Sequence, residues 1–220
     1  MKRKKETFRY DLFYRKRWIL FLLVFAVALI FTEKVMVRER EAKLAAAQQH
    51  IAEEVLRFHI LANSDSTRDQ QLKMEIKELV LRWIEAHLPE GMDSGETRLW
   101  MRKHETEIKA LCEKEVAERG YDYPVSVAVT TCYFPEKTYG DATFPEGNYE
   151  ALRIEIGKGE GHNWWCMLYP NLCFLDAVHA VLPEKGKQEL KRMLTEEEYE
   201  LCMSGGKIKC RSYFWELFGK

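Results

Sequence analysis

Four segments of the chain are predicted to be β-strands, and the first three of them alternate apolar and polar residues, as half-buried strands do. They are Val55–Leu61, Val125–Phe134, Tyr149–Ile156 and Asn163–Leu168. In the second segment, Val125, Val127, Val129 and Thr131 occupy alternate positions, which predicts one strongly buried face of that strand. We expect the four segments to share one antiparallel or mixed sheet, with the second and third strands as neighbours.

Two helical patterns lie between the first and second of these strands. The first begins after Ser66 and ends at Pro89, and its apolar residues recur at helical spacing. These residues are Leu72, Ile76, Leu79, Val80, Trp83, Ile84 and Leu88. Ser66 stands three residues before Asp69, as in a capping box. The second pattern runs from about Glu96 to Arg119. Together the patterns predict an α+β fold in which two consecutive helices pack on one face of a small antiparallel or mixed sheet.

The remaining part of the folded region is less regular. We expect a long loop over residues 135–147. The glycine-rich turn Gly157–Gly161 lacks the helix and the GK[ST] ending of a phosphate-binding loop. A charged helix is expected around Glu196–Cys202, and the weak alternation of Lys207–Phe218 suggests an added edge strand.

The N-terminal segment has the pattern of a membrane anchor or a signal sequence. Trp18–Phe31 is an unbroken apolar run of fourteen residues, which residues up to 36 extend. As a helix the run spans only ~21 Å of a hydrocarbon core that is ~30 Å thick. Eight Lys and Arg residues lie in the first seventeen positions, a bias that keeps this end in the cytoplasm. We therefore expect a signal anchor; a cleavable signal peptide is the alternative, and in both cases the remainder is exported.

These patterns divide the chain into four parts. They are a basic cytoplasmic head at 1–17, a transmembrane or signal segment at 18–36, a solvated helical stalk at 37–54 and an exported domain at 55–220. The net charge is −1, and because the basic residues are concentrated in the head, the rest of the chain is acidic. It carries no basic patch for a nucleic acid, so we expect no nucleic-acid partner.

The six cysteines are an even number, which permits disulfides in an exported domain. Cys166 and Cys173 flank a turn at Pro170, so we expect their Cα atoms within about 7 Å, close enough for a bridge. Cys112 on a helix and Cys132 on a strand are expected to be buried thiols.

No pattern of residues indicates a metal site or a catalytic group. The histidines and cysteines between His162 and His179 match no standard zinc-finger spacing. Asp65 and Asp69 lie at a helix N-terminus, where the dipole holds carboxylates ionised, which suits capping or cation binding better than general-acid catalysis. We expect no catalytic residue, no metal ion and no other cofactor.

Several motifs occur in a fixed order along the chain. The first is Arg57-Phe-His-Ile-Leu-Ala-Asn-Ser-Asp-Ser66, followed by Asp69-Gln70-x-Leu72-Lys73. Tyr121-Asp-Tyr-Pro-Val125, Phe134-Pro-x-Lys-Thr-Tyr-Gly140 and Tyr149-x-Ala-Leu-Arg153 come next. The last is Gly161-His-Asn-Trp-Trp-Cys166, which continues through Pro170 and Leu172-Cys173. From about Val55 to Cys173 the chain resembles the stage II sporulation protein R family.

That resemblance implies a function in signalling. It implies a protein of the forespore that is exported across, or anchored in, the forespore inner membrane and faces the space between the two membranes. There it would trigger a membrane-embedded aspartic protease, which removes the pro-sequence of the mother-cell sigma-E precursor. On this interpretation the chain is a ligand of a receptor protease and not itself an enzyme.

The polar turn after the first strand is the candidate contact surface. Asn63-Ser64-Asp65-Ser66 leaves a strand beside a helix N-terminus, where backbone donors and short polar side chains are exposed together. The turn before Trp164 and Trp165 is expected to lie close by, and two adjacent tryptophans on a strand cannot face the same way. The residues that we expect to contact the receptor are Asn63, Asp65, Asp69, His162, Asn163, Trp164 and Trp165.

Other interpretations stay open. Asp65 and Ser66 could serve only as helix caps, with both tryptophans in the core. An exported metal- or cysteine-dependent hydrolase of the cell envelope would need His162, Cys166 or Asp65 to converge on one pocket. A purely structural envelope protein would need an oligomerising face, and the sequence shows no heptad pattern or repeat.

Overall fold

The computed structural model describes residues 2–170, 182 and 184–205, with side chains from Arg17 onward. The expected Lys207–Phe218 strand lies outside the described residues. The chain divides into two compact units, Met1–Ala47 and Gln48–Lys220, each of which is described by itself.

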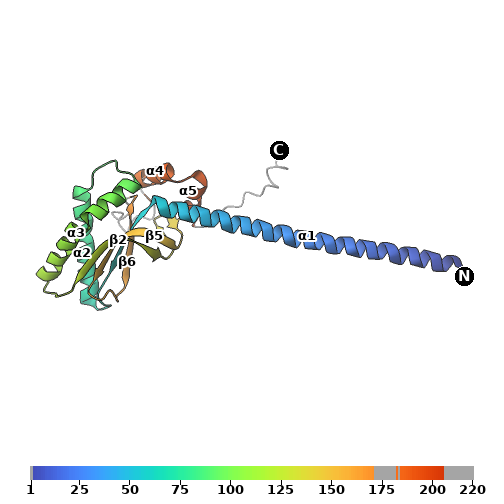
Figure 1. Cartoon of the computed structure of the whole chain (residues 1–220), viewed down its shortest axis with the longest axis horizontal. Coiled ribbons are helices and arrows are strands. Elements are labelled where there is room, and N and C mark those ends of the chain that lie inside the picture. The colour runs from blue at the N-terminus through green and yellow to red at the C-terminus, as the bar shows by residue number, and fades with distance from the viewer. Residues whose placement is uncertain (1, 171–181, 183, 206–220) are drawn as a thin grey trace. The chain divides into compact units, whose positions relative to one another are not determined.

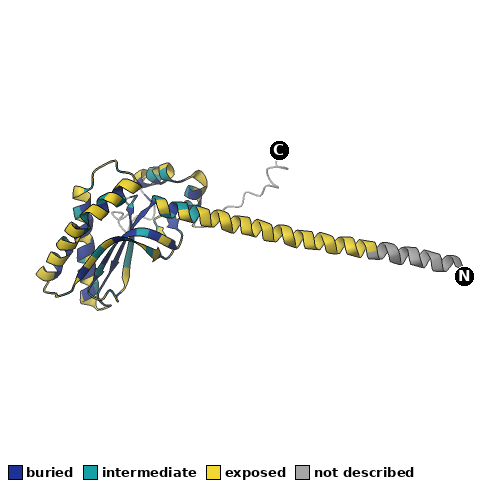
Figure 2. Ribbon diagram, viewed as in Figure 1, coloured by how far each residue is buried: buried dark blue, intermediate teal, exposed yellow. Residues whose placement is uncertain are grey.

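The first unit belongs to a single helix, α1 (Lys2–Glu54). Every large apolar side chain between Trp18 and Phe31 is more than half exposed (Figure 2). A window of 18 residues within Arg17–Glu54 has a mean hydropathy of 2.4, and none of its residues is buried. A continuous apolar surface of this kind is unfavourable in water. By length and composition, the helix therefore suits a membrane anchor or a signal sequence.

The last turns of α1 belong to the second unit and pack into it. Ile51 is fully buried. His50 Nδ1 lies 3.0 Å from an oxygen of Glu198, which is in the helix α5 (Glu196–Met203). The compact unit therefore begins before the first strand.

A four-stranded mixed sheet forms the centre of the second unit, in the order β2-β5-β1-β6. β1 (Leu56–Leu61) runs parallel to β5 (Gly147–Ile156) and antiparallel to β6 (Asn163–Tyr169). β2 (Val125–Phe134) pairs antiparallel with β5, so the predicted neighbours are adjacent. All four predicted strands are present, within two residues of their expected bounds.

Two consecutive helices, α2 (Thr67–His87) and α3 (Ser94–Glu118), cover one face of the sheet (Figure 1). Phe58 and Ile60 of β1 point into this layer, where they join Ile76 and Val80 of α2 and Ile108 of α3 in one buried cluster. The predicted α+β fold is thereby confirmed. The opposite face of the sheet, which neither α2 nor α3 covers and which is called here the helix-free face for that reason alone, carries Arg57 and His59 of β1 and their register partners.

Residues 135–147 differ from the expected loop. They contain a hairpin of β3 (Lys137–Tyr139) and β4 (Ala142–Phe144). Gly140, with φ of 60°, supplies the left-handed residue of its turn. Strands of three residues are too short to show alternation in the sequence, which explains the missed hairpin. Farther on, α4 (Glu184–Met193) precedes α5, whose position was predicted.

Candidate functional site

The turn that follows β1 and the glycine-rich turn before β6 lie against each other, as predicted. The backbone N–H of Gly161 donates to the carbonyl of Ala62 at 2.9 Å, and that of Glu160 donates to Asn63 at 3.3 Å. The side-chain oxygen of Asn63 also accepts from the backbone N–H of Lys158 at 3.0 Å. The two turns, residues 62–66 and 157–162, therefore form one corner of the domain, called here the polar corner.

Asp69 is the buried centre of this polar corner. Its Oδ2 accepts from Ser64 Oγ at 2.5 Å and from Asn63 Nδ2 at 2.9 Å, and its Oδ1 accepts from the Tyr123 hydroxyl at 3.2 Å. Burial acts to raise the pKa of the Asp69 carboxyl, but hydrogen bonds from Ser64, Asn63 and Tyr123 outweigh it, and the pKa lies below its ordinary value. With 4% of its surface exposed, Asp69 supports the polar corner from within.

The expected capping box at Ser66 is only half formed. Ser66 is the N-cap of α2, and its hydroxyl accepts from the Asp69 backbone N–H at 3.2 Å. The return bond is missing because the Asp69 carboxylate is engaged by Ser64 and its neighbours. The backbone N–H of Ser66 donates to Ser64 Oγ instead, at 3.2 Å.

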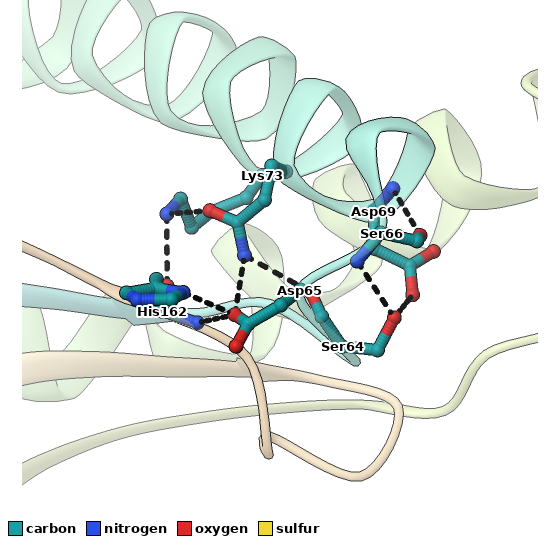
Figure 3. A network of polar contacts seen from close by, with 7 residues as sticks. Ser64, Asp65, Ser66, Asp69, Lys73 and His162 are labelled. Atoms are coloured by element: carbon teal, nitrogen blue, oxygen red, sulfur yellow. Dashed lines mark hydrogen bonds and ion pairs between the residues drawn. The ribbon is translucent and has the colours of Figure 1, made fainter.

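Asp65 and His162 form an exposed pair on top of this buried network (Figure 3). Asp65 Oδ1 accepts from the backbone N–H of His162 at 2.6 Å and also contacts the His162 Nδ1. The exposed fractions of the two side chains are 56% and 79%. The hydrogen bond from the His162 backbone, followed by that from its ring, lowers the pKa of the Asp65 carboxyl.

Lys73 of α2 is hydrogen-bonded to the turn that contains His162. Its ammonium donates to the His162 carbonyl at 2.8 Å and to Gln70 Oε1 at 2.6 Å, while Gln70 Nε2 donates to the Ser64 carbonyl at 2.9 Å. Burial lowers the pKa of the Lys73 ammonium, and the charge of Asp65 opposes that fall. The exposed Asp65–His162 pair therefore lies next to residues whose polar groups are already hydrogen-bonded to one another.

The two tryptophans lie on opposite faces of β6, as predicted, and both are half-buried. Trp164 packs edge-on against Phe58 beneath the helices, with ring centroids 5.6 Å apart. Trp165 stacks on His59 on the helix-free face, at 3.7 Å and 11°. Because they lie on opposite faces, the two tryptophans, both expected to contact the receptor, do not form one surface beside the polar corner. Asn163 is exposed beside His162.

Sequence reasoning missed a line of three side chains on the helix-free face. Cys132 Sγ lies 3.9 Å from His59 Nδ1, and His59 Nε2 lies 3.1 Å from Asn163 Oδ1. The order resembles the cysteine–histidine–asparagine arrangement of some hydrolases. Burial lowers the pKa of His59 to about 4 and raises that of Cys132, so both groups rest neutral. This is the opposite of an activated thiolate–imidazolium pair. Only the strand register, which a sequence does not give, brings the three together.

The remaining cysteines fall partly outside the described residues. Cys112 is buried as expected, whereas Cys132 is only half-buried. Cys166 is a buried thiol in the core beneath the helices, and it does not join Asp65 and His162 in one pocket. Cys173 and His179 lie outside the described residues, so the Cys166–Cys173 bridge stays a prediction. Within the described residues, no group of three or more His, Cys, Asp or Glu side chains is placed to hold a metal ion.

Comparison with known proteins identifies relatives of the folded part. A family model described as stage II sporulation protein R matches residues 52–179. The chain is similar to the stage II sporulation protein R of Bacillus subtilis (strain 168), with 38% identity over 151 residues, which cover 68% of this chain and 67% of that protein. No solved structure matches the chain. The range matched by the family model includes the whole four-stranded sheet and both turns of the polar corner.

Proposed function

Because the chain belongs to the stage II sporulation protein R family, we propose that it is an exported signal of endospore formation. In this proposal it activates a membrane-embedded aspartic protease, which then processes the mother-cell sigma-E precursor. Family membership supports the role in sporulation, and the apolar part of α1 supports a membrane anchor or signal sequence. The domain would act from the forespore inner membrane, in the space between the two membranes.

The exposed Asp65–His162 pair is the observation that links the proposal to particular residues. A ligand binds more tightly when its contact groups are ordered beforehand, because less conformational entropy is lost on association. Asp65 and His162 are ordered by the buried bonds of Asp69 and Lys73, yet more than half of each of the two side chains remains accessible. We propose that this pair, with the adjacent exposed Asn163, contacts the receptor protease.

Co-expression with the candidate receptor protease and the sigma-factor precursor tests the proposal. The readout is processing of the precursor. Asp65→Asn and His162→Ala should abolish or strongly reduce processing while the melting temperature stays within a few degrees. Glu85→Gln and His87→Ala change exposed residues in the last turns of α2, at the opposite end of that helix from the polar corner, and processing should be normal with both. Normal processing by both polar-corner variants, at equal protein levels, would show that the contact surface lies elsewhere.

One observation favours the alternative of an exported cysteine hydrolase. It is the alignment of Cys132, His59 and Asn163 described above. The two neutral groups make Cys132 a weak nucleophile at rest, which argues against this function. Cys132→Ser separates the two functions. If the chain is a signalling ligand, the precursor should be processed normally when residue 132 is serine. If it is a cysteine hydrolase, the variant should lose its activity while remaining folded.

A further inference from the structure

Asp65 is an ordered carboxylate that forms no ion pair with a lysine or arginine among the described residues. Its ion-pair contact there is with His162, whose backbone N–H also donates to Asp65 Oδ1 at 2.6 Å. Lys73 acts on Asp65 through its charge, but its ammonium is hydrogen-bonded to the His162 carbonyl and to Gln70. The Cζ of Arg68 lies 5.3 Å from an aromatic ring. The Asp65 carboxylate is therefore held in place without a cation bound to it.

The second oxygen of Asp65 is available to a partner. The bonds that order the side chain all end on Oδ1, and no dashed line reaches the other oxygen in Figure 3. Within the described residues, Oδ2 has no hydrogen-bond donor, and the side chain is 56% exposed. Because an ionised carboxylate only accepts, Oδ2 is an exposed acceptor that carries negative charge.

His162 presents a second acceptor beside the first. The pKa of Asp65 is lowered, so its carboxylate is ionised, and the His162 Nδ1 that contacts it must carry the hydrogen. In the neutral ring the other nitrogen, Nε2, then has a free lone pair. Nε2 has no partner within the described part of the chain, and the His162 side chain is 79% exposed. The pair thus offers two acceptors and no donor.

The charges of the polar corner leave the pair negative. Lys158 and Glu160, both exposed in the turn before β6, have opposite charges. Asp69 and Lys73, both buried next to the pair, also have opposite charges. Asp65 is what remains of this sum when His162 is neutral. A partner that complements this surface is therefore a cation with more than one hydrogen-bond donor.

We propose that Asp65 and His162 bind an arginine side chain on the outer face of the receptor protease, with one guanidinium N–H donated to Asp65 Oδ2 and another to His162 Nε2. A guanidinium has five donors in a planar fork and no acceptor, so it can reach two acceptors on different side chains. A lysine presents its donors from a single nitrogen. This inference rests on the proposed function and names the chemistry of the partner at that contact.

Reversing the charge on both sides of the contact tests for the arginine. Asp65→Arg should abolish precursor processing in the co-expression system. Glu85→Arg, a matched reversal at an exposed glutamate near the end of α2, should leave processing normal. Each arginine in the parts of the receptor outside the cytoplasm is then changed to aspartate, and each receptor variant is co-expressed with Asp65→Arg. We expect one of these combinations to restore processing.

The same experiment separates the two proposals. If the wild-type chain does not trigger processing, the proposed function fails, and this inference fails with it. If the wild type triggers processing and folded Asp65→Arg does not, but no receptor variant restores it, the proposed function survives and the arginine contact is overturned.

An isosteric variant tests the contact even if Asp65→Arg does not fold. In Asp65→Asn the amide oxygen can still accept from the His162 backbone, and the amide nitrogen then replaces Oδ2 with a donor. Binding of the full chain, in detergent micelles, to the purified receptor should weaken about 30-fold or more. Because the charge is lost, the remaining binding should also depend less on salt concentration than wild-type binding does. An unchanged salt dependence would overturn the proposal, whatever the affinity.

Two amide variants of His162 test the second acceptor. His162→Gln places its amide near the position of Nε2, whereas the shorter His162→Asn places its amide near Nδ1 and leaves the outer position empty. If Nε2 accepts from the arginine, the glutamine variant should bind the receptor more tightly than the asparagine variant. Equal affinities, or the reverse order, would mean that the ring only positions Asp65, and would overturn the contact with two acceptors.

Discussion

Gly161 lies so close to the backbone of Ser64 that residue 161 has no room for a side chain. A Cβ at this position would be 2.3 Å from the Ser64 carbonyl oxygen and 3.0 Å from the Ala62 Cβ. At Gly157, whose φ is +63°, a Cβ would meet the Asn63 side chain at 2.3 Å. The two glycines therefore allow the turns of the polar corner to touch, which places the His162 backbone against Asp65.

Gly161→Ala should open this contact. Because the obstacle is backbone, the turn must shift, and we expect a loss of about 2–3 kcal/mol, or a fall in melting temperature of roughly 5–10 °C. Gly95→Ala is the matched control. Gly95 lies in the first turn of α3, and its Cβ would be no closer than 3.4 Å to any atom. The control should gain up to about 1 kcal/mol, because alanine favours helix. Equal melting temperatures for wild type and Gly161→Ala would contradict the close contact.

Asp69→Asn should destabilise the domain without a specific effect on signalling. The carboxylate accepts three side-chain hydrogen bonds, and an amide cannot accept them all, so we expect a loss of about 1–3 kcal/mol at pH 7. Because the folded pKa of Asp69 is lowered, its contribution is present above the unfolded pKa of about 3.9. It disappears as the pH falls through the lower, folded value, so wild type and variant should converge in acid.

Urea unfolding at neutral and acidic pH measures this difference. Precursor processing, normalised to the amount of folded protein, should be normal in Asp69→Asn, in contrast to Asp65→Asn. Reduced processing by fully folded Asp69→Asn would restore Asp69 to the set of residues that contact the receptor.

Periodicity along the sequence predicted the parts of the fold that bury a long apolar face. α2, α3, β1, β2 and β5 each extend over at least six residues, so their pattern is clear, whereas β6 is apolar at nearly every position and alternates poorly. The polar corner was also predictable, because short polar residues stop β1 where α2 begins. The β3–β4 hairpin was not, since its strands have three residues each.

Contacts that depend on register could not be predicted from the sequence. Asp69 was expected to cap α2 or to contact the receptor, but its third acceptor bond comes from Tyr123, 54 positions away. His59 meets Cys132 only because β5 lies between their strands and sets the rows of the sheet. The aromatic rings around the buried Arg57 guanidinium likewise come from β2, β5 and the unpredicted hairpin. A one-residue slip in pairing would move such groups to the other face, and a single sequence does not fix the pairing.

Burial of His59 should make the stability of the domain depend on pH near neutrality. Its pKa falls from 6.5 to about 4 on folding, chiefly through desolvation. Between these values the unfolded chain binds a proton that the folded domain does not, so stability should decrease as the pH falls from about 6.5 to about 4. The decrease attributable to His59 is at most about 3 kcal/mol, and less where water reaches the ring.

His59→Gln should remove this part of the pH dependence. The variant loses the stacking of the imidazole on Trp165, which lowers stability by a similar amount at every pH. The readout is therefore the slope of stability against pH and not the stability itself. Proton NMR of the wild-type imidazole should show His59 titrating near pH 4. Titration near 6.5 would mean that the ring is open to solvent.

Export of the domain can be tested with reporters fused after Glu54. Alkaline phosphatase becomes active only where its disulfides form, outside the cytoplasm. The basic head and the exposed apolar run of α1 predict an active phosphatase fusion and an inactive β-galactosidase fusion. Val24→Arg combined with Ala28→Arg places two charges near the centre of the run, each unfavourable by roughly 3 kcal/mol. This pair should reverse both reporters.

The matched control replaces the same two positions with leucine, which keeps the run apolar. It should behave as the unmodified chain does, so that any reversal can be attributed to charge and not to substitution. Immunoblots of the phosphatase fusion distinguish an anchor from a cleaved signal, because cleavage shortens the product and releases it from the membrane fraction. An anchored product would keep the domain at the membrane, within reach of a membrane-embedded receptor. An inactive phosphatase fusion, with an active β-galactosidase fusion, would place the domain in the cytoplasm and contradict signalling across the membrane.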